Sequence, residues 1–308
     1  MSDRARLAWG VVAAGAILAA AGDVRGEPPT ATSDVRGEPP TATAVRGRPP
    51  VALPAGELVP FFAPRAAAGR DGAPAAGAEA DAPRRPVPVA AFALDATPVT
   101  NAEFATFLAS APRWRRSRVA RAFAEEGYLA RWAGELELGG AAATSPVTHV
   151  SWFAAQAFCR ARRGALPTTL QWEYALEDRG RDAAARQALQ LEWFAQPSTQ
   201  APGPVAQRAP NGYGVYDLVG LVWEWTLDFG ADSLGGESRN SGTRDEALVC
   251  GAGSLGARDP GDYATFMRYA FRASLRAAFT TSTLGFRCAY PIAPAPAAAP
   301  RPSRGPHQ

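Results

Sequence analysis

Lysine is absent from this sequence of 308 residues, so all 32 of its basic residues are arginine. The absence excludes a Schiff-base lysine and the lysine of a Walker-type phosphate loop. Histidine is limited to His149 and His307, too few for a zinc hydrolase or for an iron centre held by several histidines. The net charge of +3 is too small to indicate a nucleic acid or another polyanion as partner.

Cysteine is also scarce, with Cys159, Cys250 and Cys288 as the only three. Three cysteines permit at most one disulfide and leave one thiol over. A disulfide is chemically reasonable if the chain is exported. The residues alone leave the choice of pair open.

The first residues have the pattern of a signal peptide. Arg4 and Arg6 precede an apolar run from Leu7 to Ala21 that ends in small residues. The run is short for a stable membrane span. We therefore predict a signal peptide at residues 1–22, export to the periplasm or the medium, and no membrane span after cleavage, with an uncleaved anchor as the alternative.

Repeats and composition divide the rest of the chain. The sequence DVRGEPPTAT occurs at residues 23–32 and again at 34–43, a unit too short and too rich in proline and glycine for a solenoid. Residues 23–57 are predicted to be a disordered spacer, and the proline-rich residues 293–308 a disordered tail. Residues 58–292 are predicted to form one domain, which is long enough to bury a core.

Capping signals place the first helices of this domain. A strand within residues 92–100 leads to Thr100, which with Glu103 makes a capping box for a helix to about Ser110. Ser151 is predicted to cap a helix over residues 152–163, which Gly164 ends. Thr168 with Gln171 is a second capping box and starts the helix that contains Trp172.

The other segments are less regular. Residues 113–133 are predicted to be helical and carry five arginines before Phe123. Such a basic face can meet an acidic partner, but a solvated face is the favoured interpretation. Beyond Trp172, glycines alternate with short aromatic segments, which predicts irregular loops with few, short strands.

The stretch NGYGVYDLVGLVWEWTLD, residues 211–228, contains a candidate metal site. Asp217 and Glu224 lie seven residues apart with Gly220 between them, so a bent backbone can bring both carboxylates and a carbonyl to a hard cation such as calcium. Two predictions follow from this spacing. Either these groups bind a structural calcium ion, or Glu224 forms a buried ion pair with an arginine.

Four motifs together resemble the formylglycine-generating enzyme (sulfatase-modifying factor) family. They are PVTNAEF at residues 98–104, PVTHVSWFAAQAFCRARRGALPTTLQWEY at 146–174, NGYGVYDLVGLVWEWTLDF at 211–229 and LGFRCA at 284–289. The resemblance implies an α+β, C-type-lectin-like fold with much irregular structure. It also implies a disulfide between Cys159 and Cys288, and a calcium loop made by Asp217, Glu224 and the carbonyls of Gly220 and Val222.

The activity that the resemblance implies is oxidation of a sulfatase cysteine to formylglycine by a pair of thiolates that bind Cu(I). Soft thiolates are the ligands that Cu(I) prefers. In this chain residues 251–287 contain no cysteine, and Ala257 and residues 259–264 stand where the pair is expected. Cys250 with Met267 is the one remaining soft pair, but small apolar and core roles are the favoured interpretations of these residues. Bound copper is therefore not expected.

Two functional hypotheses follow. The first is an exported binding or accessory protein that holds a peptide or another ligand in a groove lined by residues 254–276. An anionic ligand is predicted from the arginines of this segment, which are Arg258, Arg268, Arg272 and Arg276. The second is a divergent oxidase that acts on a protein cysteine. The missing cysteine pair favours the first.

Overall fold

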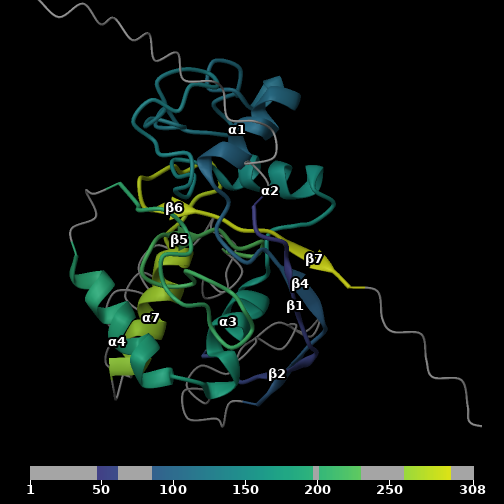
Figure 1. The fold of residues 1–308 in the computed structure, drawn as a ribbon, viewed down its shortest axis with the longest axis vertical. Coiled ribbons are helices and arrows are strands. Elements are labelled where there is room, and N and C mark those ends of the chain that lie inside the picture. The colour runs from purple at the N-terminus through teal and green to yellow at the C-terminus, as the bar shows by residue number, and fades with distance from the viewer. Residues whose placement is uncertain (1–46, 62–84, 197–200, 230–259, 293–308) are drawn as a thin grey trace, which may run out of the picture. The chain divides into compact units, whose positions relative to one another are not determined.

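A three-stranded antiparallel sheet joins the beginning of the domain to its end (Figure 1). The computed structural model describes residues 47–61, 85–196, 201–229 and 260–292. In the sheet, β4 (Phe92–Leu94) lies between β1 (Val51–Leu53) and β7 (Ala289–Pro291). Leu53 pairs with Phe92 and is fully buried.

The position of β1 corrects the predicted domain boundary. A spacer over residues 23–57 is wrong at its end, because β1 and the start of β2 (Gly56–Leu58) both fall inside it. These strands are fixed by pairing with segments later in the chain, β1 with β4 and β2 with β3 (Val87–Val89). The repeats and the composition from which the spacer was predicted do not reveal pairing with distant strands. The earlier part of the spacer, the signal segment and the tail lie outside the described residues.

The three capped helices form where the sequence predicts them. Helix α1 spans Asn101–Ser110, α2 spans Trp152–Ala161 and α3 spans Thr169–Glu177. Both capping boxes and the Ser151 cap are present. Helix α2 ends slightly earlier than predicted, because Arg163 adopts a left-handed φ of 64° before Gly164. Local side-chain hydrogen bonds thus set the starts of these helices.

The helix predicted over residues 113–133 is wrong. A 3-10 turn, η2 (Pro112–Trp114), is followed by further turns with no α-helix. Arginine side chains reach backbone carbonyls across this segment: Arg115 donates to Leu108, and Arg116 donates to Leu129 and Trp132. These long-range bonds hold the chain in an irregular path that a helical periodicity count does not reveal.

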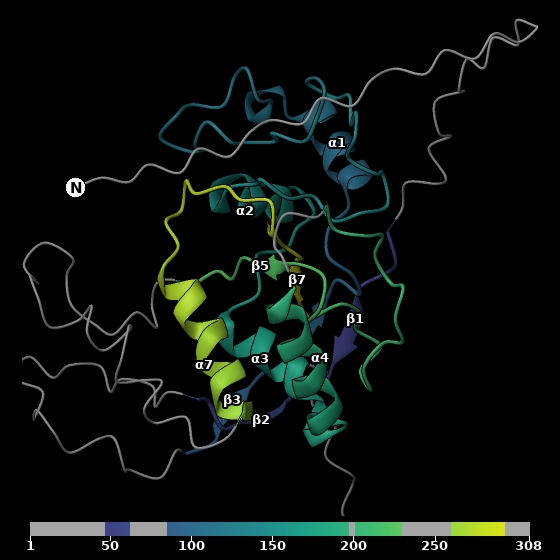
Figure 2. The same ribbon diagram turned by 90° about the vertical axis from the view of Figure 1, so that its left-hand side faces the viewer.

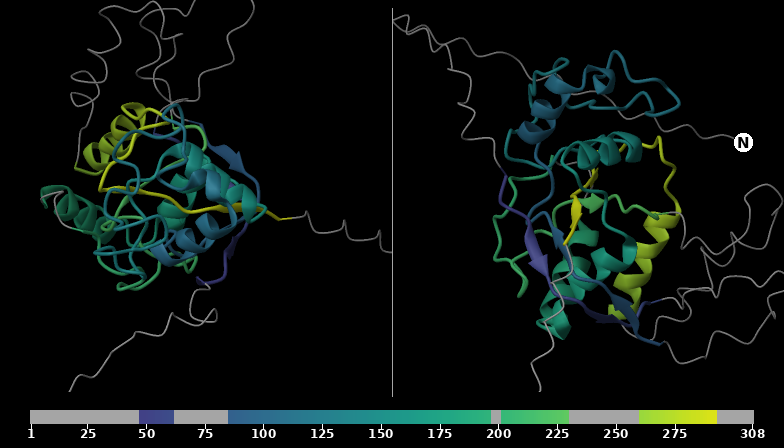
Figure 3. Two further views of the ribbon diagram at one scale, coloured as in Figure 1. Left: turned by 90° about the horizontal axis from the view of Figure 1, so that it is seen from above. Right: turned by 90° about the vertical axis from the view of Figure 1, so that its right-hand side faces the viewer.

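Two helices form where only irregular loops and short strands were predicted. After the short η3 turn (Asp178–Gly180), α4 spans Ala183–Ala195, and α7 spans Pro260–Ala273. The two helices contact each other, and α3 lies between α7 and the three-stranded sheet (Figures 2 and 3). Helices α1 and α2 lie at the other end of the domain (Figure 2).

One disulfide and one strand pairing connect the LGFRCA motif to the rest of the domain. Cys159 and Cys288 form the predicted disulfide, with Cα atoms 5.4 Å apart. The two-residue strands β5 (Trp223–Glu224) and β6 (Leu284–Gly285) pair in parallel. Cys250 lies outside the described residues. In the part of the chain that the structure describes, no helix has the length and apolar character needed to cross a membrane.

Candidate functional site around helix α7

Helix α7 is anchored by a buried carboxylate from α3. Both oxygens of Glu173 accept hydrogen bonds from Arg268, at 3.1 Å from Nε and 2.8 Å from Nη2. Arg272 Nη1 donates to the same carboxylate at 2.6 Å. The three side chains are almost completely buried, with residue exposures of 6% for Glu173, 7% for Arg268 and 5% for Arg272. One anion therefore neutralises one of the two cations inside the protein.

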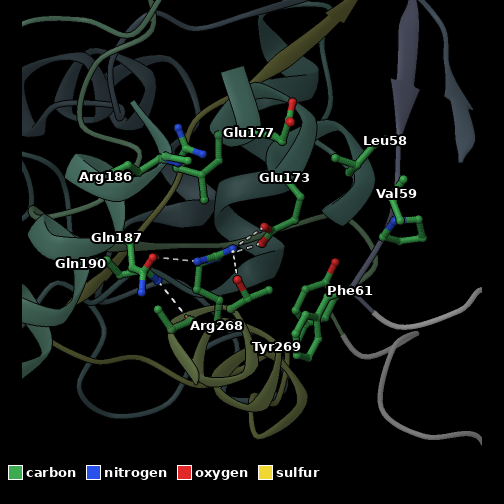
Figure 4. A pocket seen from close by; sticks show the side chains of 15 residues that line it. Leu58, Val59, Phe61, Glu173, Glu177, Arg186, Gln187, Gln190, Arg268 and Tyr269 are labelled. Carbon is green, nitrogen blue, oxygen red and sulfur yellow. Dashed lines mark hydrogen bonds and ion pairs between the residues drawn. The ribbon is translucent and has the colours of Figure 1, made fainter. Parts of the chain in front are cut away.

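Further partners occupy most of the donors of Arg268 (Figure 4). Its Nη1 donates to Gln190 Oε1 at 2.6 Å, and its Nη2 also donates to Thr265 Oγ1 at 3.2 Å. Arg272 instead stacks on the ring of Trp172, with its Cζ 4.5 Å from the ring centroid. A planar guanidinium suits both arrangements. We name Glu173, Arg268, Arg272 and Gln190 the Glu173 network.

The charges of this network also determine whether the carboxyl group of Glu173 is ionised. Burial alone would raise the pKa of Glu173, but Arg268 and Arg272 outweigh it and lower the pKa to about 2. Glu173 is therefore ionised at neutral pH and remains an acceptor for both arginines.

The network changes the predicted anionic groove. Arg268 and Arg272 were expected to face a ligand, yet both are buried against Glu173. Arg276 is exposed and lies 3.6 Å from Glu125, and Arg258 falls outside the described residues. The sequence could not reveal the difference, because the counter-charge comes from a helix 95 residues earlier in the chain. The arginines of α7 thus serve mainly to hold the helix in place.

Two pockets flank α7. The first, the polar pocket, has a volume of about 350 Å³ and lies between α3, α4, α7 and the residues that follow β2 (Figure 4). Glu177, Arg186 and Gln187 add polar groups to its wall, beside Arg268 and Glu173. Acidic and basic side chains are balanced here, so the polar pocket has no marked preference for an anion.

The second, the Trp223 pocket, has a volume of about 300 Å³. It is lined by Gly220 and Trp223 from the 211–229 motif, by Ser282 and Thr283 directly before LGFRCA, and by Met267 of α7. Trp223 stacks on Phe271 at 4.4 Å between ring centroids and contacts Trp193 at 4.9 Å and Phe194 at 5.2 Å. The 211–229 motif and the residues directly before LGFRCA therefore meet α7 at an aromatic pocket.

The described residues do not fit a Cu(I) centre. Residues 251–287 contain no cysteine, and among the described residues that line the Trp223 pocket Met267 is the single soft ligand. Cys250 lies outside the described residues. A thioether alone is a weak substitute for two thiolates. Met267 is half-buried and lies among Trp193, Phe194 and Trp223 in the wall of this pocket, so the predicted core role for this methionine stays a prediction.

The predicted calcium ligand Glu224 is held by an arginine. Arg287 donates from Nε to Oε2 and from Nη2 to Oε1, both at 2.8 Å, and the two side chains are fully buried. Trp172 Nε1 donates to Oε2 at 2.8 Å as well. This arrangement is the ion pair that the alternative interpretation of the sequence predicts. It satisfies the carboxylate without a metal.

Two of the other predicted calcium ligands, Asp217 and Gly220, also have protein partners. Asp217 adopts a left-handed φ of 56° and accepts from the backbone amide of Ala206 at 2.6 Å. Burial raises the pKa of Asp217. The carbonyl of Gly220 accepts from Arg208 Nη1 at 3.2 Å. The geometry fits the ion pair better than a calcium ion, and calcium binding by Asp217, Gly220, Val222 and Glu224 stays a prediction to be tested with the metal.

Sequence reasoning missed Gln190, Trp193 and Phe194, because α4 was not predicted. The stretch AAARQALQLEWFA contains mainly strong helix formers, and this signal could have identified the helix. It could not have shown that Gln190 contacts Arg268, which lies 78 residues further on.

Comparison with known proteins agrees with this architecture. Residues 38–292 match the model of the sulfatase-modifying factor enzyme 1-like domain. The formylglycine-generating enzyme of Streptomyces coelicolor is 31% identical over 296 residues, which cover 78% of this chain and 88% of that protein. The bovine inactive C-alpha-formylglycine-generating enzyme 2 is 30% identical over 47% of this chain and 50% of that protein.

Among solved structures, CarF aligns with a TM-score of 0.42 and 17% identity, covering 81% of this chain and 100% of that chain. The short strands, the separate helices and the long irregular segments form an α+β fold of the formylglycine-generating enzyme type. This chain belongs to the sulfatase-modifying factor enzyme 1-like family.

Proposed function

We propose that this chain is a binding or accessory member of its family that does not oxidise cysteine. The observation that carries the proposal is the composition of residues 251–287, which contain no cysteine to hold Cu(I). The described part of this segment begins with α7, whose arginines Arg268 and Arg272 are committed to Glu173. A relative that is named inactive, from cattle, supports the idea that the fold is used without this activity.

The Trp223 pocket is the proposed ligand site. Its wall combines aromatic rings with the backbone of Gly220 and the hydroxyl-bearing side chains of Ser282 and Thr283. Aromatic surfaces supply contact area at low entropic cost, and a few polar groups fix orientation. A peptide segment with a small apolar side chain suits a pocket of this size and chemistry.

The proposal also includes export. Support comes from the signal-like pattern of residues 1–22 and from the Cys159–Cys288 disulfide, since stable disulfides are typical of oxidising compartments. Mass spectrometry of the protein from its native cells tests this part. A mature N-terminus near residue 23 is expected, and an intact N-terminus on protein confined to the cytoplasm contradicts export.

A paired assay tests the main proposal. The purified chain is incubated with copper, reductant, oxygen and a sulfatase-derived peptide that contains cysteine, with the Streptomyces coelicolor enzyme as positive control. Mass spectrometry is expected to find no formylglycine beyond the buffer control. Conversion by this chain would instead support the alternative, a divergent oxidase of protein cysteine.

Calorimetry with the same peptide, carrying serine in place of cysteine, tests the site. Binding is expected, and Trp223→Leu should weaken it. The matched control is Leu136→Ala, an exposed apolar residue that lines no described pocket. Absence of binding, or equal loss in both variants, contradicts the assignment of the Trp223 pocket to this class of peptide.

A further inference from the structure

A larger groove lies away from α7, between α2 and the irregular segment that follows α1. Its volume is about 800 Å³. Aromatic rings form a continuous row along it: Trp114 contacts Phe123 at 6.1 Å between centroids, Phe123 contacts Phe153 at 5.1 Å, and Phe153 contacts Trp152 at 5.5 Å. Phe123 is 45% exposed. Contiguous exposed apolar surface that is rimmed by polar residues marks interaction sites.

The charges around this groove have one sign. Arg113, Arg118 and Arg160 line it, and no aspartate or glutamate does. In the described part of the chain, none of these three guanidinium groups makes a hydrogen bond or an ion pair, whereas the neighbouring Arg115 and Arg116 donate to backbone carbonyls. The groove therefore combines apolar rings with cations that have no counter-charge.

One further donor in the groove wall lacks an acceptor. The indole Nε1 of Trp114 is buried and has no hydrogen-bond partner among the described residues. A buried donor without an acceptor is unfavourable. Protein atoms cover this nitrogen, so a ligand oxygen would satisfy it only together with a rearrangement of the groove wall.

We propose that this arginine-rimmed groove binds an acidic peptide segment with an aromatic or aliphatic residue between its carboxylates. The apolar residue would pack against Phe123 and Phe153, and the carboxylates would pair with Arg118 and Arg160. These two arginines come from different elements, the segment after α1 and helix α2. A ligand with several anionic groups along a chain satisfies them together, whereas a small molecule with one carboxylate satisfies only one.

Fluorescence anisotropy with a labelled peptide tests the proposal. The probe is fluorescein-Gly-Glu-Asp-Phe-Leu-Asp-Glu-amide, titrated with the full chain. Two comparison peptides change one property each: Gln and Asn replace the acids in the first, and Gly replaces Phe-Leu in the second. Saturable binding of the probe is expected, with both comparison peptides binding more weakly. Equal binding of all three, or none of the probe, overturns the proposal.

Variants locate the site on the protein. Arg118→Gln with Arg160→Gln should weaken binding about tenfold, the size expected for two largely exposed ion pairs. Phe123→Ala should also weaken peptide binding. Because the Phe123 side chain is exposed, this substitution should leave the fold intact. The matched control is Arg163→Gln, an exposed arginine just beyond α2 that does not line the groove.

Two results would contradict this site. The first is equal loss of affinity in the control and the double variant, with unchanged thermal unfolding in both. The second is tighter binding of a single-stranded dT oligonucleotide than of the peptide, because stacked rings and arginines also suit nucleic acid. Neither result bears on the Trp223 pocket, which the serine peptide tests separately.

Discussion

Replacing Glu173 by glutamine removes the one negative charge that two buried arginines share. The pKa of Glu173 is lowered from its usual 4.5 to about 2. At about 1.4 kcal/mol per pKa unit, this lowering corresponds to roughly 3 kcal/mol in favour of the folded protein with the group ionised. Removing one partner of a buried ion pair is destabilising by about 3–5 kcal/mol, because the other charge remains buried. The two estimates agree.

We therefore expect Glu173→Gln to lower the free energy of unfolding by about 3 kcal/mol, and the melting temperature by roughly 10 °C for a domain of this size. Urea and thermal unfolding followed by circular dichroism measure both. The matched control is Glu192→Gln on α4, where the glutamate is exposed, and its effect should stay within about 0.5 kcal/mol.

The loss of stability in Glu173→Gln should depend on pH in a defined direction. A carboxyl group with a lowered pKa in the folded state stabilises the protein above its unfolded pKa, and this stabilisation is lost as the pH falls through the folded pKa. The difference between wild type and Glu173→Gln should therefore be full above about pH 4.5 and shrink towards pH 2. A loss below about 1 kcal/mol at pH 7, or a difference that does not change with pH, would refute the reasoning.

Three further predictions concern the rest of the domain. Burial and Arg131 lower the pKa of His149, so the free energy of unfolding should fall as the pH drops below about 6.5. In His149→Asn this fall should be smaller, and an equally steep fall with pH in both proteins contradicts the prediction. Reducing the Cys159–Cys288 disulfide, which closes a separation of 129 residues, should lower the free energy of unfolding in urea by about 4 kcal/mol; equal midpoints for oxidised and reduced protein would contradict it. The predicted calcium site requires a higher melting temperature in calcium than in chelator and a smaller rise in Glu224→Gln; equal temperatures would leave only the Arg287 ion pair.

Local hydrogen bonding explains which parts of the fold could be predicted. The starts of α1, α2 and α3 depend on Thr100, Ser151 and Thr168, and each contacts a residue within three positions. The capping residue and its hydrogen-bond partner lie within a few residues of each other, so the sequence alone predicts the start of each helix. The strands are different, because β1 and β5 contain only three and two residues and exist through pairing with distant segments.

The arginines account for much of what could not be predicted. Sequence reasoning places arginine at the surface, since it is almost never fully buried without a partner. In this chain Arg268 is buried because Glu173 lies opposite it. A buried arginine partner was predicted for Glu224, but the sequence did not show that the partner is Arg287. Arg116 donates to the carbonyls of Leu129 and Trp132, within a segment that is irregular where its neighbours suggest a helix. Each outcome depends on a partner that only the folded chain brings close.

The same partners explain why the family motifs predict the fold better than the chemistry. Glu224 from the 211–229 motif and Arg287 from LGFRCA form a buried ion pair, and their strands β5 and β6 lie side by side. Cys159 and Cys288 join the second motif to the last. This ion pair and this disulfide stabilise the fold whether or not the protein catalyses a reaction. The chemistry that the resemblance implies depends instead on thiolates within residues 251–287, which this chain lacks. Similarity in the motifs therefore transfers the architecture to this protein, and its function has to be tested at the pockets that the architecture leaves open.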